Sequence, residues 1–355
     1  MFSITVALGV GALLAPRVLA DVWNLSTTYQ GSEFMANFDY WGDTNATAKD
    51  PSNGLVKYVG KSAAQSSNVT YVDSKGLFHL QVAKNNHGAV LMPAPFFFSD
   101  VTHVPTGCSV WPAFWLVNPD TASYPKGGEF DILENANDQF HGNLQQSGIT
   151  SYANCTVDYS TGNNGCRVEM NQATITGSSA VVPTWGTELN QAGGGVFATE
   201  RSMGSAGHGV CVWYWPQSSV PTDLKVGSQS VDPSTWGTPA VDMPIANICH
   251  SNFGQQSLVL DITPCGDWAG STYNQSGCNL QYTACSYQVG YNGSSYNQSY
   301  WGINDVRVFG TGGNANAAIS PNTATESASA AAHLHVGVGA LGAVLCAGFV
   351  VSWLI

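Results

Sequence analysis

The sequence predicts an all-β protein in which two antiparallel sheets pack face to face. Three observations support this prediction. Glycine (39 residues) and aromatic residues (14 Phe, 14 Tyr and 11 Trp) are abundant, a mixture typical of many short strands joined by turns. Short apolar runs are separated by turn sequences such as Asn53-Gly54 and Lys75-Gly76. The body of the chain has no sustained helical periodicity and no internal repeat.

The expected strands follow in order along the chain. Residues 22–38 hold a first strand and a loop, and short strands are expected at 56–59, 68–72 and 77–82. The dense apolar run at 108–117 predicts a central strand, with further strands at 168–170, 209–215, 257–262 and 303–309. Segments 165–209 and 216–244 are rich in Gly, Ser, Thr and Pro. We therefore expect loops along the rim of a cleft there, held by some of the cysteines.

Composition limits the classes of partner. The 355 residues allow one large β domain or two average ones, and 44% apolar residues suffice for a sizeable core. The net charge of −12 disfavours nucleic acid and anionic membranes as partners, because both require a basic surface. A neutral or cationic substrate is easier to accommodate.

Both ends of the chain differ from its body. Residues 1–20 are typical of a secretory signal, with an apolar core and small residues at the cleavage positions, although a charged first region is missing. Residues 311–335 are rich in Gly, Asn, Ala, Ser and Thr and predict a linker. Residues 336–355 are uncharged. They are long enough for a membrane-spanning helix, but no Lys or Arg follows to fix a cytoplasmic end.

A removable glycosylphosphatidylinositol signal explains this tail better than a membrane span. The anchor would be attached at Asn322 or, alternatively, at Ser327. The expected organisation is a signal peptide (1–20), one domain (21–310), a linker carrying the attachment site (311–335) and a tail (336–355). This predicts a secreted protein at the cell surface, anchored through lipid to the outer membrane leaflet or held in the cell wall.

Cysteines and glycosylation sequons agree with export. Eight of the nine cysteines precede residue 310, and in an oxidising compartment they allow up to four disulfides of undetermined pairing. No CxxC pair with matched histidines indicates zinc. The N-x-S/T sequons predict glycosylation at Asn24, Asn45, Asn68, Asn154, Asn274, Asn292 and Asn297.

The stretch 127–135, GGEFDILEN, holds three carboxylates in a chain of which only 10% is charged. In a strand Glu129 and Asp131 share a face, whereas strict alternation turns Glu134 away. A one-residue β-bulge near Ile132-Leu133 would return Glu134 to that face. The same alternation is usual in a half-buried strand with a solvated face, but the scarcity of charge elsewhere favours a site.

Paired carboxylates point to glycoside hydrolysis. One ionised acid attacks or stabilises, and the other, with a raised pKa, protonates the leaving oxygen. Retention of configuration needs the two carboxyl groups about 5–5.5 Å apart. The side chains of Glu129 and Glu134 would have to converge over Asp131 on a curved strand.

Several segments resemble glycoside hydrolase family 16. GGEFDILEN is similar to the bulged ExDxxE signature of that family, and the preceding WPAFWLV resembles the strand before it in fungal laminarinase-like members. Later, LDITPCGDWAG (260–270) and WGINDVRVF (301–309) resemble two further segments of the same members, in the same order. The resemblance spans about residues 24–310 and implies a β-jelly-roll sandwich (concanavalin A-like) with sugars in a concave cleft.

The resemblance also implies roles for individual residues. Glu129 would be the nucleophile, Glu134 the general acid/base and Asp131 the assisting carboxylate. Trp268 would stack on a sugar ring, and Trp111 or Trp115 would line the cleft, with core packing the favoured alternative for Trp115. Family members usually have Leu-His-Thr shortly after the signature. Here Leu144-Gln145-Gln146-Ser147 stands at that place, so Gln145 would meet the substrate without carrying charge.

The function expected is a retaining endo-β-glucanase acting on 1,3- or mixed 1,3-1,4-linked β-D-glucan. One alternative is a cell-wall transglycosylase of the same family, which the bulged spacing disfavours. Another is a non-catalytic glucan-binding jelly roll, which the three carboxylates disfavour. We expect a monomer without a cofactor. The family allows a structural calcium ion on the convex face, but no acid cluster in the sequence singles out a metal site.

Overall fold

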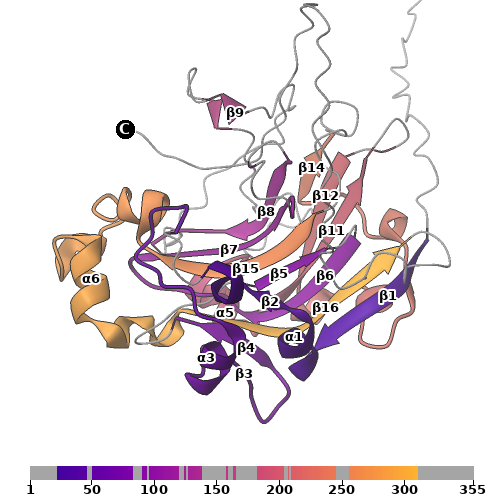
Figure 1. The fold of residues 1–355 in the computed structure, drawn as a ribbon. Helices are drawn as coiled ribbons and strands as arrows, with labels where there is room; N and C mark the ends of the chain where they lie inside the picture. Colours follow the sequence, from indigo (N-terminus) through magenta and orange to yellow (C-terminus); the bar gives the residue numbers. More distant parts are fainter. Residues whose placement is uncertain are drawn as a thin grey trace, which may run out of the picture.

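The computed structural model describes residues 22–45, 50–82, 90–93, 96–119, 124, 127–137, 157–158, 163–164, 182–203, 207, 209–244 and 256–310. Two large antiparallel sheets form the framework of the described structure (Figure 1). The predicted signal peptide, linker, tail and attachment sites lie outside the described residues. So do the expected strand at 168–170 and the side chains of Asn45 and Asn154.

The larger sheet follows the path β13-β1-β16-β6-β11-β12-β14, and β4 and β3 extend it from β16. Its strands are β1 (Trp23–Gln30), β3 (Thr70–Val72), β4 (Phe78–Gln81), β6 (Phe96–His103), β11 (Gly195–Ser202), β12 (Gly209–Pro216), β13 (Ser230–Val231), β14 (Val241–Met243) and β16 (Tyr300–Gly310). The smaller sheet runs in the order β2 (Asp39–Tyr40), β5 (Val90–Pro93), β15 (Ser257–Pro264), β7 (Val110–Val117) and β8 (Glu129–Glu134). A separate pair is formed by β9 (Val157–Asp158) and β10 (Asn163–Asn164).

Short helices connect the strands. They are α1 (Ser32–Asn37), α2 (Trp41–Asn45), α3 (Lys61–Ser66), α5 (Gly186–Gln191) and α6 (Cys285–Tyr291), with a π-helical turn at Gly266–Gly270. Further 3₁₀ turns occupy Gln217–Ser219, Thr222–Leu224, Pro233–Thr235, Cys278–Leu280 and Gly293–Gln298. Among the described residues, no helix is long and apolar enough to cross a membrane.

The main core lies between the two sheets. In β7 and β15 the even-numbered residues face it, and Phe114, Leu258 and Leu260 are at most 1% exposed. Phe197, Tyr214 and Trp301 close the core from the larger sheet. Because strand side chains alternate, the odd-numbered residues of β7 and β15 lie on the opposite face of the smaller sheet. That face carries the candidate site.

Several expected strands are confirmed and others are wrong. β1, β3, β4, β7, β12, β15 and β16 lie within or overlap the predicted ranges. Residues 56–59 form no strand; Tyr58 and Val59 are nevertheless buried. The loop expected after the first strand forms α1, and the loop expected at 165–209 contains α5 and β11.

The segment 216–244, expected as a cleft loop, contributes β13 and β14 to the larger sheet, and its Leu224 and Trp236 pack on the outer face of that sheet. Trp236 meets Trp213 and Trp215 of β12 edge to face, with ring centroids 5.3 and 5.4 Å apart. Leu224 and Val231 belong to the same apolar cluster, which is separate from the main core. The apolar residues spaced along this segment therefore anchor it away from the cleft.

Two disulfides tie the end of the fold that holds α6. They join Cys108 to Cys278 and Cys265 to Cys285. Neither of them involves the segments 165–209 or 216–244, and because Cys166 lies outside the described residues, the expectation that cysteines hold these segments stays a prediction. Cys211 is buried in β12, whereas Cys155, Cys166, Cys249 and Cys346 lie outside the described residues.

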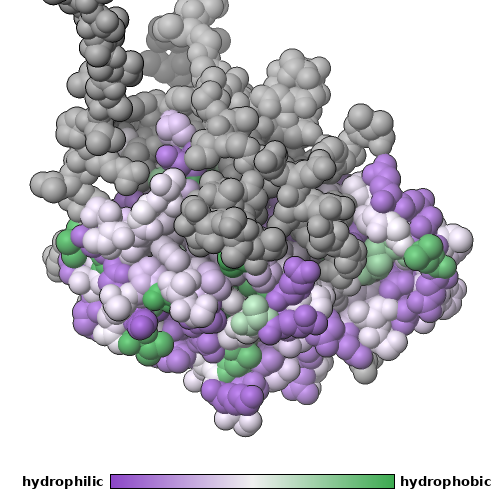
Figure 2. Space-filling view, turned by 180° about the vertical axis from the view of Figure 1, so that it is seen from behind, coloured by the Kyte–Doolittle hydropathy of each residue, from purple (hydrophilic) through white to green (hydrophobic). Residues whose placement is uncertain are grey.

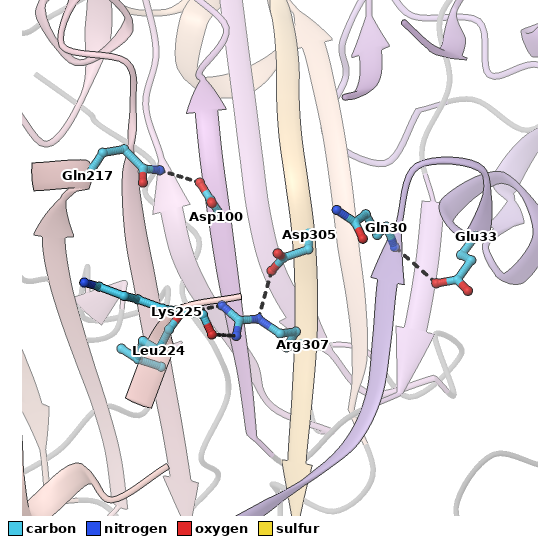
Figure 3. A network of polar contacts seen from close by, with 8 residues as sticks. All are labelled: Gln30, Glu33, Asp100, Gln217, Leu224, Lys225, Asp305 and Arg307. Carbon is cyan, nitrogen blue, oxygen red and sulfur yellow. Dashed lines mark hydrogen bonds and ion pairs between the residues drawn. The ribbon is translucent and has the colours of Figure 1, made fainter. Parts of the chain in front are cut away.

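Arg307 forms a buried ion pair within β16 and links this strand to the segment over it (Figure 3). The Arg307 guanidinium donates to Asp305 Oδ1 at 3.1 Å and to the carbonyl oxygens of Lys225 and Leu224 at 2.9 and 2.6 Å. Asp305 lies opposite Asp100 of β6 in register. Burial raises the pKa of both carboxyls, and the Arg307 charge opposes that rise.

The described surface is largely hydrophilic on the face seen from behind, with small separate apolar patches (Figure 2). Across the described residues the large exposed apolar side chains are few: Val22, Leu55, Tyr124, Val226, Leu280, Tyr287 and Tyr291.

Candidate active site

The acidic strand β8 pairs with β7 through a β-bulge at the predicted place. Asp131 pairs with Trp115 and Leu133 pairs with the next residue, Phe114, so Ile132 is the additional residue. Phe130, Ile132 and Leu133 are at most 5% exposed and pack into the core. The bulge restores the phase of the alternation, and Glu129, Asp131 and Glu134 therefore share the face away from the core.

The exit of β8 is fixed by buried polar contacts. The Asn137 side chain accepts a hydrogen bond from Ser109 N at 2.7 Å and donates to Ala269 O and Thr272 Oγ1 at 2.7 and 3.0 Å. Asn137 has a φ of 58°, a conformation that Asn tolerates better than most residues. These contacts tie the acidic strand to β7 on one side and to the π-helical turn on the other.

Trp111 is a hydrogen-bond partner of Glu134, the general acid/base candidate. Its Nε1–H donates to Glu134 Oε1 at 2.7 Å, and its side chain is 9% exposed. The resemblance placed Trp111 in the cleft, and this hydrogen bond adds the orientation of Glu134 to its role. The Trp111 ring packs closely against the backbone at Gly266, where a Cβ would lie 3.0 Å from the ring. Gly266 also has a φ of +70°, which glycine adopts without strain.

Trp268 lies behind Trp111 rather than on an open surface. It is 4% exposed and meets Trp111 edge to face, with centroids 6.0 Å apart. In the described structure Trp268 therefore packs against Trp111 and helps to hold its ring in place. Direct stacking of Trp268 on a sugar ring stays a prediction. Trp115, expected to be core, is instead half-buried on the carboxylate face. Gln145 lies outside the described residues.

Burial sets the protonation of the acids. Desolvation raises the pKa of Glu129 well above its usual range, the nearby Glu134 charge adds to the rise, and a hydrogen bond with Tyr124 opposes it. Desolvation likewise raises the pKa of Asp131, with repulsion from Glu134 and Glu129 as further causes. Because neighbouring carboxylates repel one another, these acids lose their protons one after another and not together.

Sequence reasoning did not identify two further residues of this face. Tyr124 contacts Glu129 from the loop before β8. Asp261 of β15 accepts a hydrogen bond from Trp115 Nε1 at 3.0 Å, and burial raises its pKa to about 7. Alternation along β15 could have located Asp261, because its neighbours Leu260 and Ile262 are apolar and face the core.

A neighbouring acid, Asp50, is buried but fully bonded. It accepts from Ser52 Oγ and Gly54 N at 2.7 Å and from the Tyr58 hydroxyl at 3.0 Å. Among the described residues, no group of three or more His, Cys, Asp or Glu side chains could hold a metal ion.

The predicted glycosylation sites are accessible where the structure describes them. Asn24, Asn68, Asn274 and Asn297 are exposed and Asn292 is half-buried. Occupancy of these sites stays a prediction.

Comparisons with known proteins support the fold and the family. The XgeA-like, catalytic GH16 domain matches residues 43–309. Similar curated proteins include endo-1,3(4)-beta-glucanase xgeA of Emericella nidulans (29% identical over 90% of this chain and 53% of that protein). A probable endo-1,3(4)-beta-glucanase of Aspergillus niger is also 29% identical, over 88% of this chain and 43% of that protein. The chain thus spans about half the length of these two relatives.

Solved structures give the same result. Laminarinase 16A of Phanerochaete chrysosporium, described with beta-glucans in donor and acceptor sites, is 28% identical with a TM-score of 0.61. A structure described as an elongating GH family 16 beta-1,3-glucosyltransferase is 26% identical, also with a TM-score of 0.61. Each covers 81% of this chain and 100% of its own. The β-jelly-roll prediction is confirmed, and the chain belongs to glycoside hydrolase family 16.

Proposed function

We propose that the chain is a retaining endo-β-glucanase that hydrolyses 1,3- or mixed 1,3-1,4-linked β-D-glucan. The observation that carries this proposal is the bulge at Ile132, which puts Glu129, Asp131 and Glu134 on one face. The relatives' names support glucan as the substrate class. The net charge of −12 agrees with a neutral polymer.

The proposed reaction has two steps. Glu129, as carboxylate, attacks the anomeric carbon while Glu134, held by Trp111, gives its proton to the leaving glycosidic oxygen. A covalent glycosyl-enzyme forms on Glu129 and the new chain end departs. Glu134, now ionised, takes a proton from water, whose oxygen attacks the same carbon and releases Glu129. Two inversions give net retention. Asp131 between the two acids limits how many of them ionise together.

Side-by-side digestion of laminarin, lichenan and cellulose, with product anomers followed by NMR, tests linkage and retention together. Glu129→Gln and Glu134→Gln should each abolish sugar release, whereas Glu188→Gln should not, because the Glu188 side chain is exposed on α5. Unchanged release by both site variants would refute an enzymatic role for this strand.

Azide separates the two roles on an aryl glycoside with a good leaving group. Glu134→Ala should still form the glycosyl-enzyme, which azide captures as a β-glycosyl azide. Glu129→Ala should give the α-azide, because only one inversion occurs. Reversed products would exchange the roles assigned to the two acids.

Transfer to sugar is the alternative outcome in the same chemistry, because a sugar hydroxyl can replace water in the second step. A similar solved structure is described as an elongating transferase. Products longer than the starting chain at high acceptor concentration would indicate transfer. The three retained carboxylates disfavour a purely binding function.

We also propose that the mature domain acts as a monomer at the cell surface, exported by residues 1–20 and anchored at Asn322 or Ser327. Treatment of intact cells with a phosphatidylinositol-specific phospholipase should release it. Release from Asn322→Gln but not Ser327→Ala cells would assign the anchor to Ser327.

A further inference from the structure

Asp261 lies in one line with Glu134 across three strands. Ala113 of β7 pairs with Asp261 of β15 on one side and with Glu134 of β8 on the other. Directly paired residues share a face, so both carboxylates stand on the catalytic face with only a methyl group between them. A larger residue at Ala113 would separate them.

The Trp115 side chain connects the row Asp261–Ala113–Glu134 to the neighbouring pair, Trp115 and Asp131. Trp115 pairs with Asp131 and is half-buried, and its Nε1–H donates to Asp261 Oδ2 at 3.0 Å. The Asp261 backbone is itself held from the core side, where Trp301 Nε1–H donates to its carbonyl oxygen at 2.9 Å. Hydrogen bonds from both faces of the sheet therefore hold Asp261, one to its carboxylate from Trp115 and one to its carbonyl oxygen from Trp301.

We propose that Asp261 is a positioning residue of the catalytic face: it holds the Trp115 ring over the substrate site and maintains the proton on Glu134. This inference rests on the proposed glucanase function. Asp261 does not touch the reacting atoms, so its influence passes through Trp115 and through the charge it places beside Glu134.

The charges around Asp261 make this second role possible. From β8 it faces Glu134, Glu129 and Asp131, and from the segment before α3 it faces Asp50 and Tyr58. The residues of β5 and β7 are all non-titratable, and Lys57 of that segment is exposed. An ionised Asp261 thus adds negative charge beside Glu134, which favours the protonated acid that the first step needs. Burial raises the pKa of Asp261 to about 7, so this charge changes near neutral pH.

Two substitutions separate the two roles. Asp261→Asn keeps an oxygen acceptor for Trp115 but removes the charge, so KM should change less than about twofold. The alkaline limb of the kcat/KM profile should move down by about one pH unit, because Glu134 loses its proton more easily. Asp261→Ala removes the acceptor as well, and KM should rise about tenfold. Asp242→Asn on β14 is the matched control for loss of one strand carboxylate and should leave KM and the profile unchanged.

Trp115→Phe completes the design, since it keeps a ring but loses the donor. If the hydrogen bond positions the ring, Trp115→Phe and Asp261→Ala raise KM similarly, and the double variant is no worse than the poorer single one. Additive effects, or a pH profile of Asp261→Asn that matches Asp242→Asn, would overturn the proposal. Circular dichroism at each step separates loss of fold from loss of positioning.

An independent measurement does not need activity. In protein labelled with ¹⁵N in its indoles, the signal lost in Trp115→Phe should shift with a midpoint near pH 7, and Asp261→Asn should abolish that titration. If the shift is found but no glucan is cleaved, the proposed function fails and the contact stands. If glucan is cleaved and the signal does not titrate, the role of Asp261 fails and the function stands.

Discussion

Deletion of Ile132 is the strongest test of the geometry of the acidic strand. Ile132 is the additional residue of the bulge, and the pairs on either side of it are consecutive on β7. Removing it joins Asp131 to Leu133 and leaves Trp115 paired with Asp131, and Ala113 with Glu134. The shortened sequence alternates regularly, so all three acids keep their common face.

The structure gives two magnitudes for this deletion. Ile132 is 5% exposed, and loss of a buried Ile side chain costs about 2–5 kcal/mol of folding free energy. The melting temperature should fall on the order of 10 °C. The bulge also adds local twist, so Glu134 will be slightly misplaced. A misplacement of this kind lowers activity by roughly a hundredfold.

An inserted alanine between Leu133 and Glu134 is the matched contrast. It turns Glu134 away from the catalytic face or breaks its pair with Ala113, so activity should fall to that of Glu134→Gln. Sugar release from laminarin and thermal unfolding are measured on both variants. A folded deletion variant as inactive as Glu134→Gln, beside an active insertion variant, would refute the phase argument.

Three further predictions concern single contacts. Trp111→Phe removes the hydrogen bond to Glu134, so kcat should fall about tenfold or more. Trp213→Phe is the control, because the Trp213 indole donates to Gly237 O, and its kcat should not change. Equal kcat values in the two variants would contradict the role of Trp111. Arg307→Leu leaves Asp305 buried without its cation, and chemical denaturation should show a loss of about 3–5 kcal/mol. Lys225→Met is the control, because Arg307 uses only its backbone oxygen, and an equal loss in both variants would contradict the ion pair. Burial raises the pKa of Asp261 from 3.8 to about 7, so the folded state holds a proton that the unfolded state has lost. Stability should therefore fall as pH rises from about 4 to about 7, and Asp261→Asn should make this fall smaller in a thermal-unfolding series, while the part due to the raised pKa values of Glu129 and Asp131 remains.

The sequence located the acids because their pattern is local. The three acids and the residues between them lie within six positions of one strand, so the period of a strand and one bulge are enough to place them. The flanking apolar runs of β7 and β15 were found for the same reason. The shared face of the three acids could therefore be predicted without knowing which strands pair with β8.

Elements whose character depends on distant contacts were missed. β11 was expected as loop because of its Gly-rich flank, but Gly195 lies where a Cβ would meet the Tyr214 ring of β12 at 2.3 Å. Its Glu200 is 5% exposed, which polarity along the chain does not predict. Trp268 was expected to stack on a sugar ring, yet packing against Trp111 leaves it only 4% exposed. The strand at β11 and the burial of Glu200 and Trp268 depend on residues that are distant in the sequence but adjacent in the fold.

The position of β8 in its sheet explains how the bulge is tolerated. Within the described residues β8 pairs with β7 alone, so the additional residue disturbs one ladder instead of two. Bulges are common at sheet edges for this reason, and they redirect side chains without disrupting a core. Here the cost is limited further, because the displaced Ile132 still packs into the core and Asn137 fixes the strand end. An interior strand with the same additional residue would disturb the ladders on both of its sides.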